Sequence, residues 1–159
     1  MEYHKKIPLT QGKVALVDIE DYEWLNQWKW QAHKNTKGFF YVTGRNKKQK
    51  FQIMHRKIMK APKGMEVDHI NGDGLDNRRN NLRTCSHSQN IMNSKMRIDN
   101  TNGYKGIRYH KQNKKWQARI KKNKKDNHLG YFTTPQEAAL AYNEAAKKFF
   151  GEFAKLNVI

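Results

Sequence analysis

The chain has 159 residues, enough for one medium-sized domain or two small ones. Its 32 Lys and Arg against 14 Asp and Glu give a net charge of +18, which favours a polyanionic partner, first of all nucleic acid. No apolar run approaches the roughly 18 residues that cross a bilayer, and no signal peptide follows Met1, so we expect no membrane partner. The single cysteine, Cys85, excludes an internal disulfide framework and a Cys-rich zinc site and suits a reducing cytoplasm.

The first 60 residues have the mixed pattern of a compact α+β segment. An apolar run at 14–17 predicts a strand, and apolar and aromatic residues at helical spacings predict a short helix over 18–30. Two more strands are predicted at 39–43 and 51–54, around a basic turn at 45–50. We expect the aromatic side chains of this segment to form a core rather than to stack on bases.

Residues 67–90 read VDHINGDGLDNRRNNLRTCSHSQN and carry the densest set of chemically useful side chains. An Asp-His pair ends a short predicted strand, and glycines punctuate the loop after it. The residues SHSQ at 86–89 form a capping box, which predicts a helix over 86–95. Because adjacent strand residues point to opposite faces, Asp68 and His69 share a site only if the strand ends there.

This combination suits phosphodiester cleavage, which needs a nucleophilic water and a stabilised leaving alkoxide. An imidazole can activate the water, and a divalent ion can stabilise the alkoxide. His69 is the candidate general base and Asp68 a candidate metal ligand. Asn90, in the first turn of the predicted helix, can be held rigidly toward the same ion. Oxygen ligands of this kind favour one Mg²⁺ or Mn²⁺ ion.

The same stretch resembles the HNH (ββα-metal) nuclease family in its homing-type His-Asn-Asn variant. The resemblance rests on the Asp-His pair, the Asn-rich loop, and an Asn on the helix nine residues after Asn81. It implies that His69 is the general base, that Asn81 braces it from the loop, and that Asp68 and Asn90 bind the metal. Many members have His where this chain has Asn90.

Several neighbouring side chains leave alternatives open. His87 and Asn93 lie one helical turn on either side of the expected metal ligand, so either could also bind the metal. His55 and Arg56 match the homing-type pattern as well. Their role could be structural, on the phosphate side of the site, or catalytic. Three arginines are expected phosphate contacts, although a solvated surface position is an equal alternative for the first of them: Arg78, Arg79 and Arg83.

The C-terminal third predicts a second small domain. Strands are predicted at 106–110, 115–121 and 128–132, followed by an Ala-rich helix with a capping box at 134–137 and a stop at Gly151. Alternation in the middle strand predicts one face packed on the helix and one basic outer face. Five apolar residues are expected on the inner face: Ile107, Tyr109, Trp116, Ala118 and Ile120. The outer face has a size that fits a DNA major groove.

Residues 103–157 resemble the Apetala/ethylene-response-factor DNA-binding domain. The resemblance is carried by GYKGIR at 103–108, the Trp116 strand, LGYF at 129–132, EAA at 137–139 and AKLN at 154–157. It implies DNA binding through the sheet, with contacts from Arg108, His110, Arg119, Lys121 and His128. The plant proteins tend to have Arg and Trp where this chain has His110 and His128, so their base specificity is not transferred.

Together these patterns predict an α+β protein with an N-terminal HNH ββα-metal nuclease domain, and a C-terminal three-stranded antiparallel sheet packed on one helix. The expected domains are 1–95 and 103–159, joined by a linker at 96–102. The expected activity is metal-dependent hydrolysis of double-stranded DNA, without an obligate protein partner, in the cytoplasm of a bacterial host and from a phage- or mobile-element gene. The alternatives are a non-catalytic DNA-binding transcriptional regulator and an RNA-binding protein.

Overall fold

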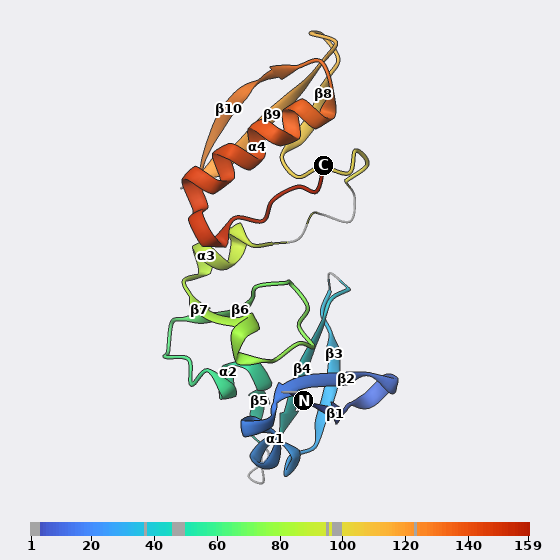
Figure 1. The fold of residues 1–159 in the computed structure, drawn as a ribbon, viewed down its shortest axis with the longest axis vertical. Helices are drawn as coiled ribbons and strands as arrows, with labels where there is room; N and C mark the ends of the chain where they lie inside the picture. Colours follow the sequence, from blue (N-terminus) through green and yellow to red (C-terminus); the bar gives the residue numbers. More distant parts are fainter. Residues whose placement is uncertain (1–3, 37, 46–49, 95, 97–99, 123) are drawn as a thin grey trace. The chain divides into compact units, whose positions relative to one another are not determined.

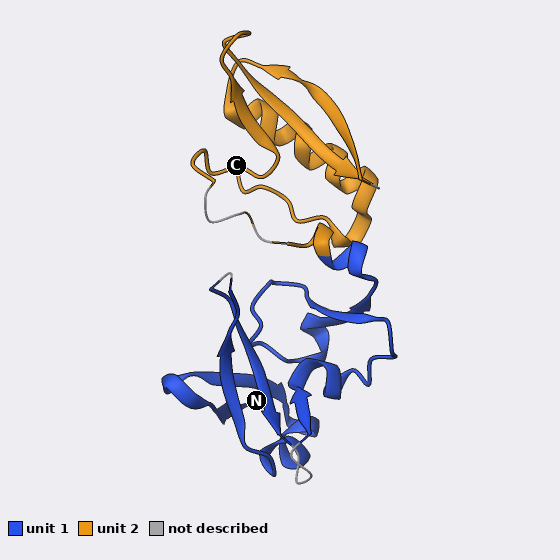
Figure 2. Cartoon of the chain, turned by 180° about the vertical axis from the view of Figure 1, so that it is seen from behind, with its two compact units in different colours: residues 1–90 blue, residues 91–159 orange. Residues whose placement is uncertain are grey.

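The computed structural model describes residues 4–36, 38–45, 50–94, 96, 100–122 and 124–159. The chain divides into two compact units, residues 1–90 and residues 91–159 (Figure 2). In the described part of the chain, no helix has the length and apolar character that a membrane span requires. The mixed α+β class predicted from the sequence is confirmed.

The first half of unit 1 consists of two antiparallel sheets with two short helices (Figure 1). The first sheet is a hairpin of β1 (His4–Pro8) and β2 (Val14–Asp18), around a 3-10 turn at Thr10–Gly12. The second has the order β3 (Trp30–Lys34), β4 (Phe40–Arg45), β5 (Phe51–Ile53). Helix α1 (Ile19–Asn26) links the sheets, and α2 (Met54–Ile58) follows β5. Most of the predicted basic turn at 45–50 lies outside the described residues.

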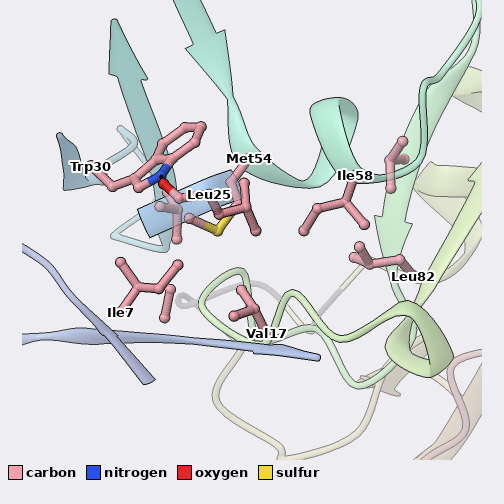
Figure 3. Packing of buried hydrophobic residues seen from close by; sticks show 10 residues of the cluster. Ile7, Val17, Leu25, Trp30, Met54, Ile58 and Leu82 are labelled. Carbon is pink, nitrogen blue, oxygen red and sulfur yellow. Dashed lines mark hydrogen bonds between the residues drawn. The ribbon is translucent and has the colours of Figure 1, made fainter. Parts of the chain in front are cut away.

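The core of unit 1 lies between these sheets and helices, as the side chains in Figure 3 show. Side chains from β1, β2, α1, β3, β4 and α2 meet there, including Ile7, Val17, Leu25, Trp30 and Met54. The Trp30 indole nitrogen donates to the Leu25 carbonyl at 2.8 Å, which satisfies its polar atom inside the core. The expectation that aromatic residues here form a core is therefore confirmed for Trp30.

The second half of unit 1 is a ββα unit. Strands β6 (Glu66–His69) and β7 (Leu82–Cys85) pair antiparallel, and helix α3 (His87–Met92) follows. The 3-10 turn η2 (Arg79–Asn81) leads into β7. The capping box is present, because Ser86 N donates to Gln89 Oε1 at 2.8 Å and Gln89 N to Ser86 Oγ at 3.3 Å. The helix ends at Met92, earlier than the expected range of 86–95, and residue 95 lies outside the described residues.

The loop between β6 and β7 is fastened to the N-terminal hairpin. Leu16 N donates to the Leu75 carbonyl at 2.9 Å, and Asn77 N donates to the Leu16 carbonyl at 2.8 Å. Gly74 makes a close approach possible, because a Cβ there would collide with the Phe40 carbonyl oxygen. The loop that follows His69 is therefore held by β2 and β4, two elements far from it in sequence.

Unit 2 is a three-stranded antiparallel sheet with helix α4 (Pro135–Phe150) lying along one face (Figure 1). The strand order is β10 (Lys125–Phe132), β9 (Lys115–Lys122), β8 (Ile107–His110), with a bulge in β10 between His128 and Gly130. The Thr134–Glu137 capping box and the stop at Gly151 are both as predicted. The predicted C-terminal sheet-on-helix architecture is therefore confirmed.

Small side chains let α4 approach the sheet closely. Ala138, Ala139 and Ala146 pack with Ala118 and Ile120 in one buried cluster. Tyr109 lies on the inner face opposite Trp116, its register partner, but it does not join the buried core as expected. Tyr109 is 49% exposed and only touches the rim of the core through Trp116, with ring centroids 5.3 Å apart.

Gly106, just before β8, lies very close to helix α4. Its φ is +79°, and an added Cβ would collide with the Tyr142 ring and lie 2.6 Å from the Arg119 carbonyl oxygen. The Gly106 carbonyl in turn accepts from Arg119 N at 2.9 Å. This glycine therefore sets the position of β8 against both β9 and α4.

Candidate functional site

His69 lies at the end of β6 and is buried, with 4% of its surface exposed. The His55 ring meets it edge-on at 4.8 Å, and the Tyr41 ring lies 6.2 Å away. Burial lowers the pKa of His69 below its ordinary value, against the opposing effects of Asn77 and nearby carboxylates. The imidazole is therefore neutral at physiological pH and has a lone pair with which to accept a proton.

Asn77 determines which ring nitrogen of His69 carries that lone pair. Asn77 Nδ2 donates to the Gly74 carbonyl at 3.4 Å, so its Oδ1 faces His69 Nε2, also at 3.4 Å. An amide oxygen only accepts, so Nε2 carries the hydrogen in the neutral ring. Nδ1 is then the basic nitrogen. The sequence analysis missed Asn77, which is fully buried yet lies among several asparagines of similar appearance.

Asn81 holds the loop that follows His69. Its Nδ2 donates to the Asp76 carbonyl at 2.8 Å and to Asn71 Oδ1 at 3.1 Å. Its Oδ1 accepts from Asn71 N at 3.0 Å, and its carbonyl accepts from Ile70 N at 2.9 Å. The Asn81 side chain thus closes the loop that follows the proposed base.

Asp68 is paired across the ββα sheet with Arg83, its register partner on β7. Arg83 Nη2 lies 2.8 Å and Nε 3.0 Å from Asp68 Oδ2. Both side chains are largely buried, so the guanidinium balances the charge of the carboxylate inside the protein. Arg83, an expected phosphate contact, therefore stands beside the expected metal ligand.

Asn90 is held by Glu66, a residue that the sequence analysis did not single out. Asn90 Nδ2 donates to Glu66 Oε2 at 2.6 Å, and His87 Nδ1 lies 2.7 Å from Glu66 Oε1. The hydrogen bond from Asn90 is the main reason why the pKa of Glu66 is lowered. Glu66 therefore fastens helix α3 to strand β6 as an ionised carboxylate.

The other two arginines of the loop are also bound to carboxylates. Arg78 Nε and Nη2 lie 2.8 and 2.7 Å from the oxygens of Asp76. Arg79 Nε and Nη2 lie 2.8 and 2.7 Å from the oxygens of the buried Asp21. Contact of either arginine with phosphate stays a prediction. In the structure, each arginine stabilises the loop through its ion pair.

The donor set around Asp68 fits a hard divalent cation. Within the described residues, no group of three or more His, Cys, Asp and Glu could hold a metal ion. A Mg²⁺ site, however, often uses one or two protein oxygens and keeps several waters. The carboxylate of Asp68 and the amide oxygen of Asn90 meet that requirement. His87 is bound to Glu66, and the buried Asn93 lies one turn further along the chain.

The outer face of the unit 2 sheet carries a row of hydrogen-bonded side chains. Arg108 Nε donates to Gln117 Oε1 at 2.7 Å, and Gln117 Nε2 donates to Tyr131 Oη at 3.2 Å. The His110 and His128 rings pack against Tyr131 at 5.2 and 4.7 Å. Alternation along β9 predicts that Gln117 lies on this outer face. It does not predict that Gln117 is buried there between its neighbours.

The remaining expected contacts lie beside this row. His128 pairs in register with Arg119, and Asp126 with Lys121. Arg119 also forms an ion pair with Asp126 at 3.3 Å. All five residues expected to contact DNA therefore project from one face of the sheet, opposite α4.

Comparison with known proteins gives relatives for both halves of the chain. A family model described as HNH endonuclease matches residues 60–92, which include the whole ββα unit. An uncharacterized HNH endonuclease of Acanthamoeba polyphaga mimivirus is 30% identical over 94% of this chain and 77% of its own length. Protein 3.8 of Escherichia phage T7 is 29% identical over 59% of this chain and 77% of its own length.

A second group of relatives consists of plant proteins. The AP2-like ethylene-responsive transcription factor ANT of Arabidopsis thaliana is 48% identical over 56 residues, 34% of this chain and 10% of that protein. No solved structure matches the chain. These relatives confirm the AP2/ERF-like region, and the mimivirus relative covers nearly the whole chain. The chain belongs to the HNH endonuclease family.

Proposed function

We propose that this chain is a divalent-metal-dependent endonuclease that hydrolyses phosphodiester bonds in double-stranded DNA. The observation that carries the proposal is the geometry of His69. It is a buried neutral imidazole whose Nε2 faces Asn77, and it directly follows Asp68 in the chain. A neutral imidazole held in one tautomer suits a general base.

In this proposal each residue of the ββα unit has one role. His69 Nδ1 takes a proton from the attacking water, and Asn81 keeps the loop behind the ring closed. Asp68 and Asn90 hold the cation, either Mg²⁺ or Mn²⁺, through oxygen atoms. A cation held by these two residues would stabilise the charge on the phosphate and the leaving 3′-oxygen. The products are a 5′-phosphate and a 3′-hydroxyl.

Unit 2 is proposed to hold the duplex. Its sheet presents Arg108, Arg119 and Lys121 on one face, and their positive charge suits the DNA backbone. Similarity to plant AP2 factors supports this use of the sheet. We propose a nuclease domain at 1–95, a linker at 96–102 and a DNA-binding domain at 103–159. The viral relatives support a phage or mobile-element origin, with activity in the host cell.

A plasmid-cleavage experiment tests the catalytic proposal. Supercoiled plasmid is incubated with Mg²⁺, Mn²⁺ or EDTA and with the wild type, His69→Ala, or the control His33→Ala on an exposed strand position. We expect metal-dependent open-circle product from the wild type and the control and none from His69→Ala, with DNA affinity preserved in all three. Equal loss of cleavage and binding in His69→Ala would contradict the assignment of the base.

The same experiment separates the alternatives. Tight DNA binding without cleavage under any metal would favour the non-catalytic regulator. Higher affinity for duplex RNA than for duplex DNA at one salt concentration would favour the RNA-binding protein. For unit 2, Arg119→Ala is expected to weaken DNA binding at physiological salt while Mn²⁺ binding is unchanged. Unaltered affinity would show that the sheet does not contact DNA.

A further inference from the structure

Glu66 has an unusual position for a carboxylate that is not itself an expected metal ligand. Both of its oxygens are engaged by α3, Oε2 by Asn90 Nδ2 at 2.6 Å and Oε1 by His87 Nδ1 at 2.7 Å. The bonded residues lie 24 and 21 positions away in the sequence. Glu66 thus joins the first strand of the ββα unit to its helix at the turn that carries Asn90.

The chemistry of this contact determines which way the Asn90 amide faces. Asn90 Nδ2 lies 2.6 Å from Glu66 Oε2, and a carboxylate oxygen accepts hydrogen bonds whereas the amide NH₂ donates them. The NH₂ group of Asn90 must therefore face Glu66, and its Oδ1 faces the other way. Within the described part of the chain, no hydrogen bond to Asn90 Oδ1 is present.

The position of Glu66 on the strand adds a second constraint. Glu66 and Asp68 are two residues apart on β6, so their side chains project from the same face. By holding Asn90, Glu66 keeps the helix side chain on the face that also carries Asp68. The amide would otherwise rotate freely, and half of its orientations would offer a nitrogen, which has no lone pair for a cation.

We propose that Glu66 is a positioning residue that makes Asn90 present its amide oxygen to the divalent cation. The proposal rests on the proposed function, because it takes Asn90 as a metal ligand. Glu66 acts through Asn90 and does not touch the metal. Outer hydrogen-bond partners of metal ligands typically contribute about 10-fold or more to metal affinity.

A double-mutant cycle tests this role through Mn²⁺ affinity, measured on the full chain by the electron paramagnetic resonance of free Mn²⁺. Glu66→Gln can pair with either end of the Asn90 amide, so it removes the orientation while keeping size and shape. We expect about 10-fold weaker Mn²⁺ binding. In the Asn90→Asp background both terminal atoms are oxygens, so orientation no longer matters. There, Glu66→Gln also relieves repulsion between two carboxylates, and we expect unchanged or tighter binding.

The cycle distinguishes orientation from other roles. If Glu66 bound the cation directly, or only attracted it by charge, Glu66→Gln would weaken binding in both backgrounds, and the proposal would be overturned. Ser86→Ala removes the cap of α3 without touching the amide, and it controls for a loosened helix. An equal loss of Mn²⁺ affinity in Ser86→Ala would overturn the proposal as well.

A separate comparison isolates a failure of the underlying site. Asn90→Ala is expected to weaken Mn²⁺ binding at least as much as Glu66→Gln does. If the wild type and Asn90→Ala bound Mn²⁺ equally, Asn90 would not be a ligand, and both the site and the role of Glu66 would be refuted. If Asn90→Ala lost affinity and Glu66→Gln did not, the site would stand and only the positioning role would fall.

Discussion

His55 is the buried side chain from which we expect a strong dependence of stability on pH. It is 8% exposed, its Nδ1 is buried without a hydrogen-bond partner among the described residues, and its ring stands edge-on to His69 at 4.8 Å. Burial is the main cause that lowers its pKa from 6.5 to about 3, and the charges of His69 and Arg56 add to the effect. The folded protein therefore keeps this ring neutral well into the acid range.

The sign and size of the effect follow from proton binding by the two states. The unfolded chain protonates this histidine near pH 6.5, whereas the folded protein does so only near pH 3, so the unfolded state binds more protons in between. The free energy of unfolding is unaffected by His55 above pH 6.5. It falls by about 1.4 kcal/mol per pH unit below it, or about 3 kcal/mol at pH 4.5. The lowered pKa of His69 adds a loss in the same direction.

The variant His55→Phe keeps a ring in the pocket and removes the proton site. Urea unfolding of the full chain, followed by tryptophan fluorescence at pH 7.5 and pH 4.5, gives the loss of stability for each protein. We expect the wild type to lose about 3 kcal/mol more than His55→Phe over this range. The exposed control His33→Phe is expected to follow the wild type. Parallel pH curves for the wild type and His55→Phe, or an NMR titration of His55 near pH 6.5, would refute the reasoning.

Three further substitutions test contacts inside each of the two units. Arg79→Ala leaves the buried carboxylate of Asp21 without its bidentate partner, and we expect a loss of about 2 kcal/mol in urea unfolding, partly restored by Arg79→Lys. Gly74→Ala places a methyl group against the Phe40 carbonyl, and we expect about 1–3 kcal/mol of destabilisation and slower plasmid cleavage. Gly106→Ala combines a positive φ with overlap against α4, so fluorescence anisotropy should show weaker DNA binding while Mn²⁺ affinity is unchanged. A wild-type result for any of them would contradict the contact in question.

The parts of the fold that the sequence predicts are those with local signals. The capping boxes at Ser86 and Thr134 place two helix starts, and alternation in β9 separates the faces of the unit 2 sheet. The N-terminal half is harder, because its pairings are distant. Strand β1 has a single buried side chain and was not expected at all. The helix predicted over 18–30 ends at Asn26, because pairing with β4 draws Trp30 into a strand.

The candidate site shows the same division. Asp68, His69, Asn81 and Asn90 could be assigned from spacing and from a family pattern, and the assignment of their roles stays a prediction. What spacing does not reveal is which groups these side chains meet. The bond from Asn90 to Glu66 depends on how β6 and α3 pack. Likewise, Arg79 and Asp21 are 58 residues apart in the sequence, and no local pattern predicts that they pair.

The charge pattern of the site explains why its arginines are paired. The chain has only 14 acidic residues, yet four of them fall within residues 66–76, around the proposed base. Carboxylates there attract a cation but repel the phosphate that must approach it. Pairing Asp68 with Arg83, and Asp76 with Arg78, places a positive charge against each of these two acids. The proposed site would hold a cation and accept a polyanion, which requires this balance, and the basic composition of the rest of the chain would then attract the DNA.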